Sequence, residues 1–248
     1  AQSTGAVPEW AVGTPAGDLV RGVLERAGGV GTGGSAGGPA WPGLLPPLDQ
    51  WTNPDLAASA IGTHQSATAL QLWAAYNVIA NDGRYVQPRL VDSITSPDGT
   101  RTPVESVEPR QVISARAAQA VSDMLQEVVR DGTGKALDLP GYDVAAKTGT
   151  SRMVSPEKVN TKDAYMWADG RYHYVAAFTG FLPADRPQVS ITVIIEDSSA
   201  GLTGATAAGP VFGDLAKLSI RELGIAPAGS TRPASGSGPV RAAPAAGA

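Results

Sequence analysis

A change of hydrophobic periodicity near residue 144 constrains the fold of this chain more than any other feature. Before that point, in segments 68–80 and 114–130, apolar residues recur at the three- and four-residue spacing of a helix face. After it, residues 144–150, 172–181 and 189–196 have the composition of strands, and helical spacing returns in residues 208–223. This order predicts an α/β (α+β) fold in which an antiparallel sheet is flanked by helices.

Local signals set the ends of several of these elements. Thr68 and Gln71 have the spacing of a capping box, in which each side chain bonds the other residue's backbone N–H. The short segment 183–187 holds two prolines and predicts a hairpin between the last two strands. The apolar residues that we expect on the second and third helices are Ala117, Val121, Met124 or Leu125, and Val128, then Val211, Phe212, Leu215, Leu218 and Leu223.

The distribution of glycine and proline predicts the limits of the ordered domain. The 248 residues include 30 Gly and 20 Pro, about a fifth of the chain, whereas a globular domain averages about 12%. Residues 1–40 contain a glycine-rich run and are expected to be a weakly structured remnant. Residues 227–248, rich in Pro, Ala and Gly, are expected to form a disordered tail. Residues 41–226 then form the folded domain.

Charge and composition exclude several classes of function. The net charge is −4 and no dense Lys/Arg cluster is present, which argues against a nucleic-acid partner. The absence of Cys excludes disulfides and a Cys nucleophile, and His64 and His173 are too few for a multi-histidine metal centre. No apolar run in the sequence approaches the roughly 18 residues of a membrane span. Composition therefore argues against a nucleic-acid partner, a Cys nucleophile and a multi-histidine metal centre.

The candidate site is the segment Lys147-Thr148-Gly149-Thr150, which follows an apolar strand. An ammonium beside a hydroxyl can bind a carboxylate, and glycine lets a substrate backbone lie against the strand because it has no Cβ. Lys-Thr-Gly is one of three motifs of β-lactamases and penicillin-binding proteins. Taken alone, it fits equally a solvated lysine at the end of a strand.

Further motifs surround the Lys-Thr-Gly segment on both sides. They are Ala60–Gly62, Thr68–Leu72, Tyr76–Gly83, Gly132–Lys135, Val144–Thr150, Asp169–Tyr172, Phe178–Asp185 and Gly209–Phe212. In this order they resemble the transpeptidase domain of class B penicillin-binding proteins, notably the division-specific type. The similarity extends from about Trp41 to Ala226, with Ala146 and Ser151 as small departures from the usual Gly and Ala.

This resemblance implies a β-lactamase/transpeptidase-like fold and an extracytoplasmic D,D-transpeptidase of peptidoglycan synthesis. It implies that Lys147 forms an electropositive wall that supports proton transfer and that Thr148 binds the carboxylate of a stem peptide or β-lactam antibiotic. Gly149 keeps the strand open, and Thr150 lends a backbone N–H to the oxyanion hole and shares the carboxylate through its hydroxyl. Cell-division or glycosyltransferase proteins are the implied partners, at the outer face of the bacterial cell membrane. The resemblance implies no metal or organic cofactor.

Two motifs of that family are missing from the chain. No Ser-x-Asn occurs, and the only Ser-x-x-Lys is Ser155–Lys158, which follows the Lys-Thr-Gly strand instead of preceding it. We expect Ser155 to be a solvated loop serine. The nucleophile and a membrane anchor are then expected outside this chain, which would be the C-terminal part of the domain. Two alternatives stay open: a binding module or pseudo-enzyme without a nucleophile, and a β-lactamase or β-lactam sensor.

Other candidate residues have simpler explanations. The glycines of residues 29–34 match a dinucleotide motif but lack the flanking strand and helix, so a flexible loop is expected. Gly134-Lys135 lacks the rest of a phosphate loop and is expected to be a turn. His173 is predicted to be half-buried in a strand and His64 to lie at the surface. Tyr165 and Trp167 are expected to pack within their own loop, although this loop could cover the cleft expected beside the Lys-Thr-Gly strand.

Overall fold

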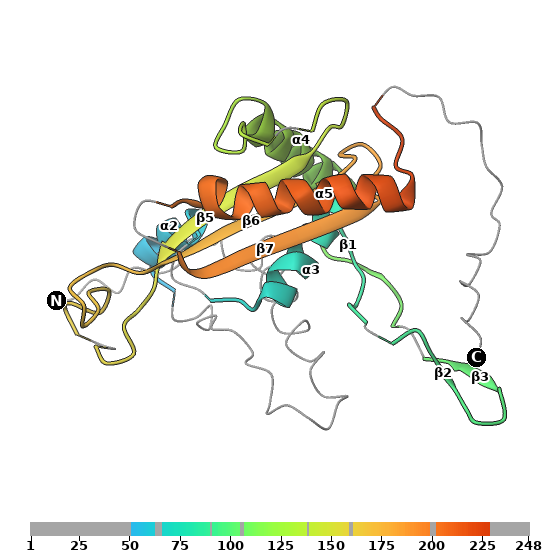
Figure 1. Cartoon of the computed structure of the whole chain (residues 1–248), viewed down its shortest axis with the longest axis horizontal. Coiled ribbons are helices and arrows are strands. Elements are labelled where there is room, and N and C mark those ends of the chain that lie inside the picture. The colour runs from blue at the N-terminus through green and yellow to red at the C-terminus, as the bar shows by residue number, and fades with distance from the viewer. Residues whose placement is uncertain are drawn as a thin grey trace, which may run out of the picture.

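The centre of the molecule is an antiparallel sheet of three strands in the order β5-β6-β7 (Figure 1). The computed structural model describes residues 51–62, 66–89, 91–104, 107–137, 139–158, 161–198 and 202–228. The strands are β5 (Ala145–Arg152), β6 (Tyr174–Leu182) and β7 (Val189–Ser198). The predicted strands and the predicted hairpin are thus confirmed, with β6 beginning two residues later than expected. The segment 1–40 and most of the tail 227–248 lie outside the described residues.

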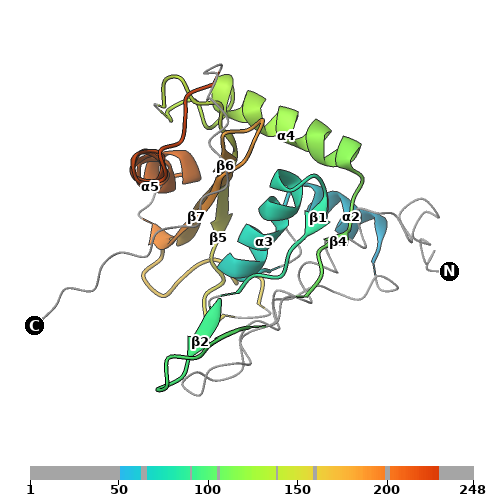
Figure 2. The same ribbon diagram turned by 90° about the vertical axis from the view of Figure 1, so that its right-hand side faces the viewer.

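Helices cover both faces of this sheet, as Figure 2 shows. Helix α5 (Gly209–Leu223) lies on one face, and α3 (Ala69–Ala80) and α4 (Ala115–Arg130) lie on the other. The remaining elements are α2 (Asn53–Ala60), β1 (Arg84–Tyr85), β2 (Ser93–Thr95), β3 (Arg101–Pro103), β4 (Arg110–Gln111) and the π-helical turn η3 (Gly204–Ala208). The expected arrangement of an antiparallel sheet flanked by helices is confirmed. No helix in the described ranges is both long and apolar enough to cross a membrane.

The core on the α5 side is built around two phenylalanines. The rings of Phe178 on β6 and Phe212 on α5 lie 4.7 Å apart between centroids, and both side chains are fully buried. Small residues bring α5 close to the sheet, so its buried face consists of Gly209, Phe212, Gly213 and Ala216. Of the apolar residues expected on this helix, only Phe212 is buried: Val211, Leu215, Leu218 and Leu223 are 40–57% exposed.

The face of α4 that packs against α3 and β5 agrees in part with the predicted one. Leu125 is buried and Val121 packs against the same cluster, as expected. Ala118 and Ser122 are also buried, whereas Ala117 is exposed and Met124 is 65% exposed. The expected residues have the correct helical spacing, but the helix is rotated about its axis so that the small side chains of Ala118 and Ser122 are buried. Close approach of α4 to the sheet explains this choice, because Ala and Ser occupy the least space between a helix and its neighbours.

Helix α3 is fixed at its start and along its length. The predicted capping box is confirmed: Thr68 Oγ1 accepts from the Gln71 N–H at 3.1 Å, and Gln71 Oε1 accepts from the Thr68 N–H at 2.9 Å. Two further bonds attach the helix to β7, since Ser190 Oγ donates to Asn77 Oδ1 at 3.0 Å and Trp73 Nε1 donates to the Ser190 carbonyl at 3.3 Å. These contacts hold α3 against the strand farthest from β5.

Candidate functional site

The four residues of the Lys-Thr-Gly-Thr segment lie in the middle of β5, an edge strand of the sheet in the described part of the chain. Side chains alternate along a strand. Ala145 packs on the α3 and α4 side and Ala146 on the α5 side. Alternation therefore places Lys147 and Gly149 toward the α3 and α4 side, and the two threonines toward α5 and η3. All four residues border the open backbone edge of β5.

The Thr148 hydroxyl is held by a second threonine. Thr133, in the turn after α4, lies with its Oγ1 2.7 Å from Thr148 Oγ1. That turn is fixed by backbone bonds, with the Gly134 N–H donating to the Val128 carbonyl and the Lys135 N–H to the Gly132 carbonyl. The expected turn at Gly134-Lys135 is therefore confirmed, and its function is structural: it carries Thr133 to β5.

The Thr150 hydroxyl is held by the start of η3. The Gly204 N–H donates to Thr150 Oγ1 at 2.9 Å. A Cβ at position 204 would collide with the backbone of Gly149 and of Ala177, so only glycine lets η3 approach the two strands this closely. This contact fixes the backbone of β5 at the glycine of the segment.

The Lys147 ammonium is exposed and close to its own strand. Its Nζ donates to the Thr148 carbonyl at 2.9 Å. Among the described residues, no carboxylate forms an ion pair with it, so its positive charge is available to an incoming anion. A backbone bond at a surface costs little to exchange for a charge-assisted bond.

A pocket of about 210 Å³ lies beside this strand, on the α5 side. None of residues 147–150 lines the pocket. Two residues that contact or pair with β5, Thr133 and Phe178, do line it, as do Asp214 and Lys217 of α5. The pocket is thus adjacent to the candidate site and separate from its polar groups.

One expectation for the loop after β5 is wrong. Ser155 is not solvated but 1% exposed, because its N–H donates to the Ala164 carbonyl at 2.7 Å and closes the loop around it. The Ser155–Lys158 segment forms a turn and no helix, since the Lys158 N–H donates back to the Ser155 carbonyl at 3.1 Å. A buried serine in a turn does not have the environment of an activated nucleophile.

The other loop residues are placed as follows. Trp167 packs within the loop as expected: its Nε1 donates to the Met153 carbonyl at 3.2 Å, and its ring stacks on His173. Tyr165 is 46% exposed. His173 is partly buried but precedes β6 instead of lying in it. His64 and residues 29–34 lie outside the described residues.

Two supports of the site, Thr133 and Gly204, were not predicted from the sequence. Each is distant along the chain from the threonine that it contacts, by 15 and 54 residues. Within the described ranges, no group of three or more His, Cys, Asp or Glu residues is arranged to hold a metal ion.

Comparison with known proteins establishes the family. The pattern described as the penicillin binding protein transpeptidase domain matches residues 34–217, which is most of the chain. The chain belongs to this family. The resemblance drawn from the Lys-Thr-Gly segment and its flanks is thereby confirmed, and the homologues of this transpeptidase-family chain are class B penicillin-binding proteins.

Its relatives include proteins of Mycobacterium tuberculosis and Neisseria flavescens. Penicillin-binding protein PbpB of Mycobacterium tuberculosis is 35% identical over 183 residues, which cover 70% of this chain and 26% of PbpB. The probable peptidoglycan D,D-transpeptidase PenA of Neisseria flavescens is 32% identical over 204 residues, 80% of this chain and 44% of PenA. The crystal structure of penicillin-binding protein 3 of Mycobacterium tuberculosis with ampicillin matches with a TM-score of 0.69 and 31% identity over 87% of this chain and 47% of that one. The transpeptidase-family chain thus spans less than half the length of these relatives.

Proposed function

We propose that this chain forms the Lys-Thr-Gly wall of a peptidoglycan D,D-transpeptidase that cross-links stem peptides through a serine acyl-enzyme and is acylated by penicillin. The observation that carries the proposal is the edge strand β5, on which two threonine hydroxyls are each fixed by a second group. Beside them lies Lys147, whose Nζ bonds only a backbone carbonyl among the described residues. Membership of the transpeptidase family supports the same reaction. Septal cell-wall synthesis, at the outer face of the cell membrane, is the proposed setting, with cell-division or glycosyltransferase proteins as partners.

Each residue of the segment has a proposed role. Lys147 supplies positive charge to the proton transfers of acylation, and Thr148 donates to the carboxylate of the substrate or antibiotic. Thr150 provides a backbone N–H to the oxyanion hole, where one donor contributes about 10²- to 10³-fold in rate, and its hydroxyl shares the carboxylate. Gly149 leaves the edge of β5 open to a peptide backbone, which pairs with an exposed strand edge by main-chain hydrogen bonds.

The nucleophile in this proposal comes from outside the 248 residues. The sequence has no Ser-x-Asn, and its only Ser-x-x-Lys is the buried turn at Ser155. A serine from another segment attacks the carbonyl of the penultimate D-Ala, and the terminal D-Ala leaves. An amine of a second stem peptide then attacks the acyl-enzyme and releases the serine.

Intact mass measurement after treatment with benzylpenicillin tests this proposal. The full-length protein in which this chain occurs is expected to gain the mass of one penicillin, whereas the 248-residue chain alone is expected to gain none. A stable full-length protein without any adduct would support the binding-module alternative. Rapid release of hydrolysed penicillin would support a β-lactamase. An adduct on the isolated chain would overturn the assignment of the nucleophile to another segment.

The support of Thr148 gives a second prediction. When Thr133 donates to Thr148 Oγ1, the proton of Thr148 remains free for a carboxylate. Replacing Thr133 by Val removes that donor, so the second-order rate constant of penicillin acylation is expected to fall about five- to tenfold, the equivalent of one neutral hydrogen bond. Thr133→Ser keeps the hydroxyl and is expected to retain most of the rate. Equal loss in both variants would contradict a role for the hydroxyl.

A further inference from the structure

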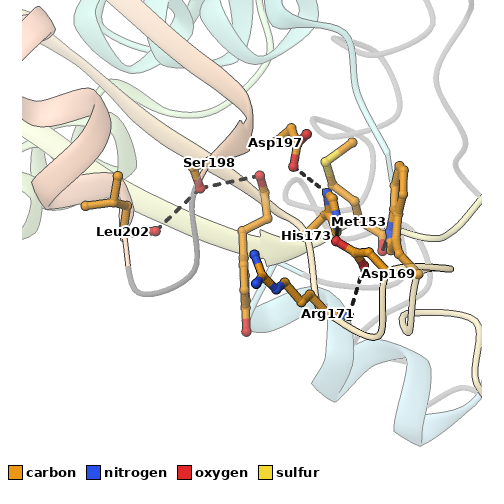
Figure 3. A network of polar contacts seen from close by, with 9 residues as sticks. Met153, Asp169, Arg171, His173, Asp197, Ser198 and Leu202 are labelled. Atoms are coloured by element: carbon orange, nitrogen blue, oxygen red, sulfur yellow. Dashed lines mark hydrogen bonds and ion pairs between the residues drawn. The ribbon is translucent and has the colours of Figure 1, made fainter.

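His173 lies between two aspartates at the base of the loop that joins β5 to β6 (Figure 3). Its Nε2 is 3.1 Å from Asp169 Oδ2, and its Nδ1 makes a short hydrogen bond with Asp197 Oδ1. The imidazole side chain is only 18% exposed, although the two carboxylates are 47% and 63% exposed. A ring that contacts a carboxylate through each nitrogen is best satisfied when both nitrogens carry protons. The carboxylates bind opposite nitrogens, so the three groups do not converge on one point as metal ligands do.

This histidine also closes the loop onto the end of β5. The Met153 N–H, directly after the strand, donates to the His173 carbonyl at 2.8 Å. Trp167 stacks on the imidazole at 4.2 Å between ring centroids, and its Nε1 donates to the Met153 carbonyl. Both backbone polar groups of Met153 are thus bonded: its N–H to the carbonyl of His173, and its carbonyl to Trp167, whose ring stacks on His173. Met153 lies three positions beyond Thr150.

The second aspartate connects the same histidine to η3. Asp197 lies near the end of β7 and has a φ of 55°, a left-handed conformation that is uncommon for a residue other than glycine. The next residue, Ser198, lies within hydrogen-bond distance of the Tyr174 and Leu202 carbonyls, at 3.4 and 3.5 Å. Leu202 is two positions before Gly204, the residue whose N–H binds Thr150. The His173–Asp197 contact therefore links the loop that follows β5 to the end of β7, beside the segment that leads to Gly204.

We propose that protonated His173 is a positioning residue for the Lys-Thr-Gly-Thr site, because its bridge between Asp169 and Asp197 clamps the β5–β6 loop to the end of β7. The bridge itself is independent of the reaction, whereas its effect on acylation rests on the function proposed above. Loss of the proton removes one of the two donors, and the imidazole of His173 then releases one of the two carboxylates.

The charged groups around the ring determine when the bridge is complete. Those that contact it are Asp169 of the loop and Asp197 of β7. Arg171 acts on Asp169, and Arg152 of β5 lies over the neighbouring Tyr172 ring, with its guanidinium 4.2 Å from the ring centroid. The hydrogen bond to Asp169, followed by the bond and charge of Asp197, raises the His173 pKa above its ordinary 6.5 against the opposing effect of burial. The Arg171 N–H, followed by His173, lowers the pKa of Asp169 below its ordinary 3.8.

The pKa shifts of His173 and Asp169 define the pH range in which the bridge is complete. The contribution of a raised histidine pKa is complete below 6.5 and is lost as the pH rises through the raised value. The contribution of the lowered Asp169 pKa is complete above 3.8 and is lost as the pH falls through the lowered value. We therefore expect the loop to be most firmly held between these two ordinary values and to loosen in alkaline solution.

Proton NMR of the 248-residue chain tests the clamp without any acylation. The sequence has two histidines, so His64→Ala leaves His173 as a single titrating ring. Its pKa is expected above 6.5. Above that pKa the protection factor of the Met153 amide, which corrects for the base-catalysed rise of the intrinsic exchange rate with pH, is expected to fall about three- to tenfold, as for one exposed charge-assisted bond. Asp197→Asn, which keeps an acceptor without the charge, is expected to lower the pKa. Asp163→Asn removes an exposed carboxylate of the same loop and is expected to leave it unchanged. A His173 pKa at or below 6.5, or the same shift in both variants, would overturn the clamp.

The pH profile of acylation tests the positioning role in the full-length protein. The rate is expected to fall as His173 loses its proton. Asp197→Asn is expected to move that fall to lower pH. At pH 5.5 to 6, up to about one unit below the ordinary histidine pKa, the rate of this variant is expected to stay near that of the parent. A uniform loss of rate at every pH, or an unmoved profile, would overturn positioning by the clamp. If no variant and no parent protein is acylated, the proposed function fails, and the NMR measurement alone decides whether the clamp exists.

Discussion

Replacing Lys147 by Ala is expected to slow penicillin acylation of the full-length protein by about 10²- to 10³-fold, the range of a lost charge or donor that acts in the transition state. The physical reason is that the exposed Lys147 Nζ, which bonds only the Thr148 carbonyl among the described residues, is the ammonium group of the proposed cleft wall. The hydrogen bonds of Thr133 and Gly204 to β5 do not involve the lysine side chain, so the strand is expected to keep its structure.

The matched control is Lys158→Ala. Lys158 lies in the loop that follows the same strand and completes the only Ser-x-x-Lys of the chain. Stopped-flow measurement with a fluorescent penicillin is expected to give the parent rate for this variant. If Lys158→Ala abolished acylation while Lys147→Ala did not, the Ser155–Lys158 turn would be the reacting pair, and the roles assigned to β5 would be wrong.

Replacing Phe178 by Ala is expected to lower the free energy of unfolding by about 3–5 kcal/mol, the usual cost of removing a buried phenylalanine. Phe178 is 1% exposed, packs against Phe212, and lies directly opposite Thr148 in the β5–β6 register. The cavity left behind would remove the support of β5 from the α5 side. Urea unfolding of the 248-residue chain, followed by circular dichroism, measures this change.

A second large apolar residue gives the control for that experiment. Leu218 on α5 is 44% exposed and lies outside the buried face of the helix that contains Phe212, so Leu218→Ala is expected to change stability by less than about 1 kcal/mol. Similar losses for Phe178→Ala and Leu218→Ala would contradict the packing of α5 described here, because they would require both faces of the helix to be buried.

The features that could be predicted from the sequence are those that depend on neighbouring residues. The capping box of Thr68 and Gln71 spans one helical turn, and the β6–β7 hairpin depends on a short connection between two alternating segments. The Lys-Thr-Gly-Thr segment belongs to the same class, because a strand places its own residues on an edge. Local chemistry specifies each of these without reference to the rest of the chain.

The features that could not be predicted depend on how distant segments meet. Apolar spacing places Ala117, Met124 and Leu125 near one helix face, but the small side chains of Ala118 and Ser122 determine the rotation of α4. Ser155 is buried because its loop closes on Ala164, which polarity alone does not reveal. The bond between Thr133 and Thr148, and that between His173 and Asp197, each join segments that no periodicity relates.

The open edge of β5 would restrict the registers in which a peptide can pair with this strand. A peptide that pairs with an edge strand lengthens the sheet by one strand, and a slip of one residue turns every one of its side chains to the opposite face. The two faces of β5 differ here, since one carries an ammonium and the other two fixed hydroxyls. A peptide laid on this edge can therefore place its terminal carboxylate beside the hydroxyls only in alternate registers. Strand β5 would therefore determine which residues of the peptide, numbered from its carboxyl end, face the hydroxyls.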